Sequence, residues 1–156
     1  MFTASRIQAD SKPEFYSQLV QQARGLLHGE HDRIANAANL SALVWHALDG
    51  INWCGFYFFD GRELVVGPFQ GKPACIRIPL GKGVCGTAAQ NGETQLVPDV
   101  HAFRGHIACD GASNAEIVVP VCRDGAVLAV LDLDSPSPGR FTAEDEAGLR
   151  GEVVGL

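Results

Sequence analysis

The sequence predicts an α+β domain in which a central antiparallel sheet carries helices on one face and includes a long loop. The first observation is a change of hydrophobic period, from a helical repeat in residues 11–48 to two-residue alternation in the middle of the chain. The second is a pair of tight-turn signals, Asp60-Gly61 and Asp124-Gly125, which join strands as hairpins and imply antiparallel pairing. The third is the order of elements, helices first, then strands, then a helix, which is typical of α+β folds.

Amphipathic helices are expected at both ends of the chain. Residues 11–27 begin with a capping serine, Ser11, and carry leucines at helical spacing. Residues 32–48 carry a second apolar stripe and end before an Asp-Gly pair. A last helix is expected over residues 142–156 with Thr142 as its cap, although its glycines specify it weakly.

Residues 52–134 are expected to hold the sheet and the functional site. Strands are predicted at residues 52–59, 63–69, 75–79, 116–122 and 126–134. A glycine-rich turn leads into a short helix that stops at Asn91-Gly92. Residues 94–114 have few periodic apolar positions and predict a long loop, and loops of that length are usually functional. Residues 1–156 are thus interpreted as a single domain.

The composition excludes several classes of protein. Hydrophobic residues make up 46% and charged residues 19%, which is typical of a globular domain. The 18 acidic and 12 basic residues give a net charge of −6, which argues against a nucleic-acid partner. The longest apolar runs are too short to span a membrane, and the start shows no secretory signal. The five cysteines are an odd number and too few for a disulfide scaffold, and since no secretory signal is seen, we expect a reducing cytoplasm.

Carboxylates gather on one face of the predicted sheet. Asp132 and Asp134 lie two residues apart in a strand and therefore share a face, and Glu116 opens the neighbouring strand. A pocket that contains all three would raise at least one pKa, so that a carboxyl group donates a proton near neutral pH. The alternative is a strand end that emerges into solvent, with Asp134 capping the following turn.

The cysteines differ in their surroundings. Cys54 alternates with phenylalanines and is expected to be an inert core thiol, and Cys122 ends a strand and is expected to be structural. Cys85 precedes a helix whose amides would lower its pKa. Cys109 lies in the long loop near His106 and an aspartate, which makes it the better candidate for a nucleophile.

Two other motifs are weak indications of a dinucleotide site and of a zinc site. The segment GKGVCG fits the dinucleotide pattern G-x-G-x-x-G, but the short helix after it does not lead into a second parallel strand. His101, His106 and Cys109 are possible zinc ligands by type, yet no paired spacing supports them. We therefore expect neither a dinucleotide nor a metal.

A longer run of residues resembles a known family. The segment IPLGKGVCGTAAQNGETQLVPDVHAFRGHIACDGASNAEIVVPV, with NWCGFYFF before it and AVLDLDS after it, is similar to the free methionine-(R)-sulfoxide reductases, which have the GAF fold. GKGVCG, GHIACD and the spacing of three cysteines are its most specific parts, and the match covers about residues 52–141. The resemblance implies a GAF-like single domain that reduces free L-methionine-(R)-sulfoxide to methionine without an organic cofactor or metal.

The resemblance also assigns roles to residues. It makes Cys109 the nucleophile, Cys75 the resolving cysteine and Cys85 a second cysteine of the site that can also enter a disulfide. The substrate-binding residues would be Trp53, Tyr57, Glu116, Asp132 and Asp134. An intramolecular disulfide would be recycled by thioredoxin or a similar reductant, and a homodimer is left open. The alternative function is a GAF sensor that binds a small molecule or reports redox state without turnover.

Overall fold

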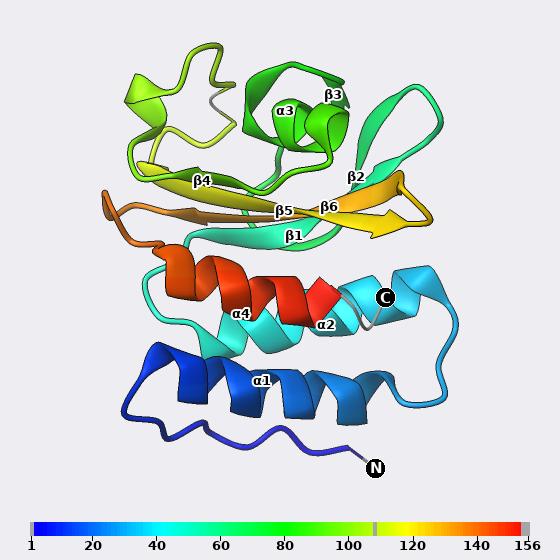
Figure 1. Cartoon of the computed structure of the whole chain (residues 1–156), viewed down its shortest axis with the longest axis vertical. Helices are drawn as coiled ribbons and strands as arrows, with labels where there is room; N and C mark the ends of the chain where they lie inside the picture. Colours follow the sequence, from blue (N-terminus) through cyan, green and yellow to red (C-terminus); the bar gives the residue numbers. More distant parts are fainter. Residues whose placement is uncertain (1, 108, 154–156) are drawn as a thin grey trace.

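The computed structural model describes residues 2–107 and 109–153, which fold around one six-stranded sheet (Figure 1). The strands lie in the order β3-β2-β1-β6-β5-β4, and all neighbours are antiparallel. Their bounds are β1 Trp53–Phe59, β2 Glu63–Gly71, β3 Arg77–Pro79, β4 Gln95–Val97, β5 Ala115–Arg123 and β6 Ala126–Ser135. The antiparallel sheet predicted from the hairpin turns is confirmed.

The helices divide between the two faces of this sheet. They are α1 Lys12–Leu27, α2 Arg33–Ala47, α3 Gly83–Asn91 and α4 Ala143–Val153. Figure 1 shows α2 and α4 against one face, with α1 as an outer layer, and the short α3 on the opposite face. The three long helices therefore share a face as expected, and the other face is left for α3 and the loops. No helix in the described part of the chain combines the length and apolar character that crossing a membrane requires.

The structure differs from the expectation in the long segment before β5. Residues 94–114 contain the short strand β4 and a 3-10 turn, η1 (Val100–Ala102), within what was expected to be continuous loop. β4 forms because the outer edge of β5 offers unpaired backbone groups, and Leu96 pairs there with Ile117. Residues 154–156, which belong to the expected last helix, lie outside the described residues.

The two N-terminal helices begin where the sequence predicts. The Ser11 hydroxyl accepts a hydrogen bond from the Glu14 amide at 3.3 Å. The Asp32 carboxylate accepts one from the Ala35 amide at 2.8 Å. Each side chain satisfies one of the amides that have no partner inside the first helical turn.

The main core lies between the long helices and the sheet. Leu19 and Leu40 from α1 and α2 meet Phe56, Ile117 and Leu131 from the central strands, and none of these side chains is exposed. Burial of each such side chain stabilises the fold by roughly 1.5–3 kcal/mol. This layer holds β1, β6 and β5 rigidly, so that their opposite face can carry polar groups.

The last helix is held to the first by one buried carboxylate. Asp145 accepts hydrogen bonds from the Lys12 ammonium at 2.6 Å, the Tyr16 hydroxyl at 2.7 Å and the Thr142 amide at 2.8 Å. Burial alone would raise the pKa of Asp145, but these donors lower it below its ordinary value. Close packing of Gly148 on Tyr16 completes this contact.

We predict that Gly148→Ala destabilises the protein although alanine favours helices. The new Cβ would lie 2.0 Å from Cγ of Tyr16, so the helices must separate. We expect the free energy of unfolding in urea to fall by about 1–3 kcal/mol. Gly25→Ala in α1 is the matched control, because its Cβ would lie 3.4 Å from the Phe2 ring, an ordinary contact, and should stabilise by up to ~1 kcal/mol. Equal stability of Gly148→Ala and wild type would contradict this packing.

Candidate active site

The register of three central strands brings the candidate carboxyl groups together. On the face opposite the long helices, Trp53 of β1 pairs with Asp134 of β6, which pairs in turn with Glu116 of β5. Two residues along the same face, Gly55 lies opposite Asp132. Because the side-chain period of a strand is two, these positions point the same way. The shared face predicted from the sequence for Asp132 and Asp134 is confirmed.

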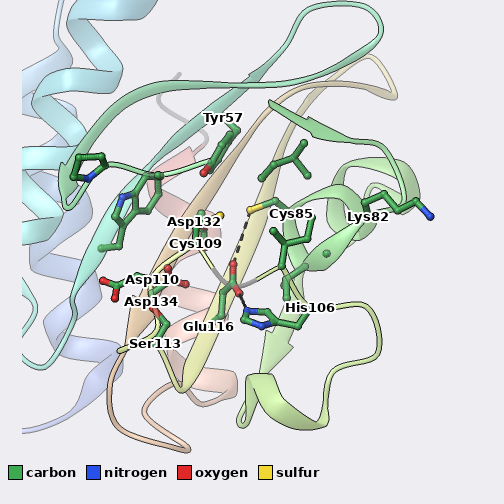
Figure 2. Close-up of a pocket in the computed structure, with 17 residues that line it drawn as sticks. Tyr57, Lys82, Cys85, His106, Cys109, Asp110, Ser113, Glu116, Asp132 and Asp134 are labelled. Atoms are coloured by element: carbon green, nitrogen blue, oxygen red, sulfur yellow. Dashed lines mark hydrogen bonds and ion pairs between the residues drawn. The ribbon is translucent and has the colours of Figure 1, made fainter. Parts of the chain in front are cut away.

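A pocket opens above this face (Figure 2). Its floor comes from β1, β5 and β6, one wall comes from the start of α3, and the segment after η1 covers it. Among its lining residues are Trp53, Tyr57, Cys85, Cys109, Glu116, Asp132 and Asp134. Cys75 joins the pocket through its disulfide with Cys109. The structure thus brings together every residue that the resemblance names.

The three carboxyl groups are enclosed. Glu116 and Asp132 are 7% and 5% exposed, and Asp134 is half-buried. Burial, with a smaller contribution from Asp134, raises the pKa of Glu116 to about 8. Burial also raises the pKa of Asp132 and Asp134, and each is raised further by a neighbouring carboxylate. The alternative of a strand end emerging into solvent is therefore wrong, and Glu116 holds its proton at neutral pH.

Two oxygens of this cluster have no partner in the structure. Oδ1 of Asp132 and Oδ1 of Asp134 are buried and accept no hydrogen bond from any described residue. Buried polar atoms are nearly always satisfied, and an unsatisfied one costs about 1–3 kcal/mol. The pocket therefore presents two acceptors to a ligand that carries N–H donors.

Cys85 differs from its sequence-based expectation. It is buried in the first turn of α3, and its Sγ lies 3.9 Å from Oε1 of Glu116. Burial, together with Asp132 and Glu116, raises the pKa of its thiol. The prediction that helix amides lower this pKa is wrong, because burial and the nearby carboxyl groups outweigh the amides. Cys85 is a protonated thiol that contacts Glu116.

The other two cysteines of the pocket form a disulfide. Cys75 and Cys109 are joined across 34 positions of sequence, with their Cα atoms 5.7 Å apart. Cys75 lies just before β3 and is half-buried, whereas Cys109 is exposed. Cys54 is fully buried in the main core as expected, and Cys122 is exposed at the end of β5, outside this pocket. The pairing implied by the resemblance is present.

Aromatic rings form a second wall of the pocket. The Trp53 ring stacks on Tyr57 with centroids 5.7 Å apart and on Phe69 at 5.1 Å. Its indole N–H donates to the Lys72 carbonyl at 3.1 Å, which fixes the ring. Burial, then the Asp132 carboxylate, raises the pKa of Tyr57, so its hydroxyl keeps its proton. The wall is rigid and apolar, and it suits a methyl group or a soft sulfur atom.

The structure gives His106 a contact that the sequence did not predict. Nε2 of His106 lies 3.6 Å from Oε2 of Glu116, and Figure 2 shows its ring turned toward that carboxyl group. Burial lowers the pKa of His106. His101, by contrast, is exposed and contacts the Asn114 amide oxygen at 2.9 Å. His101 does not line the pocket that holds His106 and Cys109, so these three residues are not brought together.

The structure also shows a hydrogen-bonded contact between β1 and the loop that no sequence pattern predicted. The Asn52 amide donates to Asp110 and to the Ser113 hydroxyl, both at 3.1 Å, and this ties β1 to the loop. Ser113 also hydrogen-bonds Asp134, which lowers the pKa of that carboxyl group against the effect of its burial. Such contacts depend on the path of the loop, which hydrophobic periodicity does not encode.

One group of ligand atoms could surround a small cation. Atoms of Cys85, Glu116 and Asp132 lie within 4.8 Å of one another, and all three residues are buried. Thiolate and carboxylate ligands suit a metal ion, and carboxylate oxygens also suit an ammonium group. Because Cys85 and Glu116 keep their protons, these atoms suit the N–H donors of an ammonium group better than a metal ion.

We predict that Glu116 makes stability depend on pH. Its pKa is about 8 in the folded protein against an ordinary value of 4.5, so the unfolded chain releases this proton first as pH rises. Stability is therefore lost as pH rises from about 4.5 to about 8. Glu116→Gln should reduce the loss measured in urea between pH 5 and pH 8 by roughly 2–5 kcal/mol. Glu93→Gln, at an exposed position, is the control. An unchanged slope in Glu116→Gln would contradict the raised pKa.

Comparison with known proteins agrees with this geometry. The GAF-domain profile matches residues 37–151. A free methionine-R-sulfoxide reductase of Escherichia coli is 52% identical over 146 residues, which cover 94% of this chain and 88% of that protein. The free methionine-R-sulfoxide reductase of Neisseria meningitidis, solved with its substrate, is 40% identical with a TM-score of 0.94 and coverage of 99% and 93%. The reduced form of the Staphylococcus aureus fRMsr is 46% identical with a TM-score of 0.88 and coverage of 98% and 96%. This chain therefore belongs to the GAF-domain family and, within it, to the free methionine-R-sulfoxide reductases.

Proposed function

We propose that this enzyme reduces free L-methionine-(R)-sulfoxide to L-methionine, with Cys109 as the nucleophile and thiols as the source of electrons. The observation that carries the proposal is the meeting of a cysteine pair and three enclosed carboxyl groups in one pocket. A cysteine pair supplies two electrons, and a protonated carboxyl group supplies the proton that a sulfoxide needs. The names of the relatives in E. coli and N. meningitidis support the same activity.

The first chemical step is attack by the Cys109 thiolate on the sulfoxide sulfur. The sulfoxide oxygen takes a proton from Glu116, Asp132 or Asp134 and is transferred to the cysteine sulfur. Methionine leaves, and Cys109 becomes a sulfenic acid. Because burial raises the pKa of Glu116 to about 8, a proton is available near neutral pH, and burial also raises the pKa of Asp132 and Asp134.

The second step forms the disulfide. Cys75 attacks the sulfur of the Cys109 sulfenic acid, and the oxygen leaves as water after taking up a proton. Thioredoxin or a similar dithiol then reduces the disulfide by exchange, so no organic cofactor enters the cycle. We place this cycle in the cytoplasm, where thiols are kept reduced.

Binding of the free amino acid follows from the same pocket. The unpartnered oxygens of Asp132 and Asp134 would accept the α-ammonium group, and Trp53 and Tyr57 would enclose the S-methyl group. Backbone amides at the start of α3, near Cys85, would hold the α-carboxylate. A peptide-bound sulfoxide lacks both charges and would leave these groups unpaired, at a cost of several kcal/mol.

We predict that the enzyme consumes one stereoisomer of its substrate. Chiral chromatography of free L-methionine-(R,S)-sulfoxide, after incubation with the enzyme and dithiothreitol, should show loss of the R isomer alone. Cys109→Ser should consume neither isomer, because the serine hydroxyl is a far weaker nucleophile. A tripeptide with a central methionine sulfoxide should remain intact. If the folded and reduced enzyme consumed neither isomer, the sensor function would be favoured instead.

We predict a different defect for the resolving cysteine. Cys75→Ser should form about one methionine per enzyme and then stop with thioredoxin as reductant, because Cys109 remains a sulfenic acid. Quenched-flow measurement of methionine, with a sulfenic-acid probe and mass spectrometry, checks both points. Cys122→Ser, at an exposed position outside the pocket, should cycle like wild type. Full thioredoxin-dependent turnover by Cys75→Ser would refute the resolving role.

A further inference from the structure

Two large apolar side chains are exposed beside the disulfide. Ile76 follows Cys75 directly and is 69% exposed, which is more than any other large hydrophobic residue in the described part of the chain. Ile107 precedes Cys109 by two positions and is 37% exposed. A single exposed isoleucine is ordinary on a protein surface. Here the two exposed isoleucines lie one and two positions in sequence from the two cysteines of one disulfide.

The position of Ile76 is set by the end of an edge strand. Strand alternation would place Ile76 on the same side as Ile78, which is 4% exposed. The chain bends at residue 76, where the Ile76 carbonyl accepts a hydrogen bond from the Val66 amide at 2.9 Å. The bend turns this side chain away from the small core that Ile78 enters. Since β3 is the last strand of the sheet, its outer edge is open to a partner.

Basic side chains lie around this apolar contact. Lys72 and Lys82 are both exposed, in a chain whose net charge is −6. Figure 2 shows Lys82 at the start of α3, reaching away from the carboxyl cluster toward the outside of the pocket. Arg77 is also exposed but pairs with Asp60 and Glu63, and Asp110 beside Lys72 is half-buried. The two lysines are thus exposed basic groups near the disulfide.

We propose that Ile76 and Ile107, with Lys72 and Lys82 at the rim, form the docking surface for a thioredoxin-type protein that has apolar and acidic groups around its reactive dithiol. The proposal rests on the proposed function, which requires an external thiol to reach this disulfide. Even the small transient interfaces of redox partners bury several hundred Å² on each side. The Cα atoms of Cys75 and Ile76 are consecutive and thus about 3.8 Å apart, so an interface of that size centred on the disulfide would include Ile76.

The exchange at this surface has a definite order. The thiolate of the reductant attacks the sulfur of Cys109, the more exposed of the two residues, and forms an intermolecular disulfide. The bond to Cys75 breaks, and Cys75 leaves as a thiolate that takes up a proton. The second thiol of the reductant then attacks the intermolecular bond and releases Cys109 as a thiolate. The reductant loses two electrons and becomes a disulfide, and this enzyme gains the two electrons as the Cys75 thiol and the Cys109 thiolate, while the second proton of the reductant goes to solvent.

A comparison of two reductants tests the docking surface. Ile76→Ser is assayed with thioredoxin and its reductase, and separately with dithiothreitol, which is too small to cover Ile76. We expect kcat/KM for thioredoxin to fall about fivefold to tenfold, while turnover with dithiothreitol stays unchanged. Ile76→Leu should restore the wild-type value. Leu128→Ser changes another exposed side chain, 44% exposed on β6, and should have no effect.

A second measurement tests the charged rim. Raising the salt concentration should lower kcat/KM for thioredoxin in the wild type, because screening weakens attraction between exposed charges. Lys72→Gln should flatten this salt dependence. Turnover with dithiothreitol, a small reductant with at most a single thiolate charge at attack, should depend much less on salt. A salt dependence equal for the two reductants would overturn the role of the lysines.

The other outcomes separate the docking surface from the proposed function. Equal thioredoxin kinetics in Ile76→Ser and wild type would overturn the docking surface and leave the reductase function standing. A loss of dithiothreitol-driven turnover in Ile76→Ser would place Ile76 in the site and also overturn it. A shift of Ile76→Ser from dimer to monomer in light scattering would make this patch a contact between copies of the chain. Absence of dithiothreitol-driven turnover in the wild type would contradict the function itself.

Discussion

The burial of three carboxyl groups on one face of the sheet is the constraint on which the rest of the site depends. Antiparallel register aligns Glu116, Asp134 and Trp53 across neighbouring strands and leaves Asp132 beside them. Low polarity and mutual repulsion raise the pKa of each carboxyl group. This face of the sheet therefore holds carboxyl groups that can donate a proton and carboxyl oxygens that have no hydrogen-bond partner. It suits a ligand that carries N–H donors and a reaction that consumes a proton.

Burying carboxyl groups on one face of the sheet costs free energy. Packing of the apolar opposite face of the same strands offsets that cost. Phe56, Leu131 and Ile117 alternate with the pocket residues along β1, β6 and β5, and they pack against the long helices. The helical layer thus stabilises the strands that hold the carboxyl groups, without contacting the pocket. The short α3 and the loop that carries Cys109 close the other side, and the disulfide with Cys75 links that loop to the edge of the sheet.

Local sequence pattern predicted the parts of the site that a strand determines. The alternation of β1 and β6 placed Trp53 with Tyr57 and Asp132 with Asp134, because a pleated strand directs every second side chain to one face. It could not predict the contact of His106 with Glu116, which joins a loop to a strand. It also gave the wrong direction for the pKa of Cys85, since a helix start is visible in sequence but the carboxyl groups packed on it are not.

The sequence by itself determined the α+β class, the hairpins, the order of the elements and the identity of the cysteines, because these follow from local period, turn residues and a recognisable motif. Only the tertiary structure decided that the carboxyl groups are enclosed rather than solvated, that Cys85 keeps its proton, and that Ile76 is exposed beside the disulfide. Each of these depends on which distant segments exclude water from a group. Water is excluded by segments that can lie far apart in the sequence, so local sequence pattern does not reveal which groups are buried.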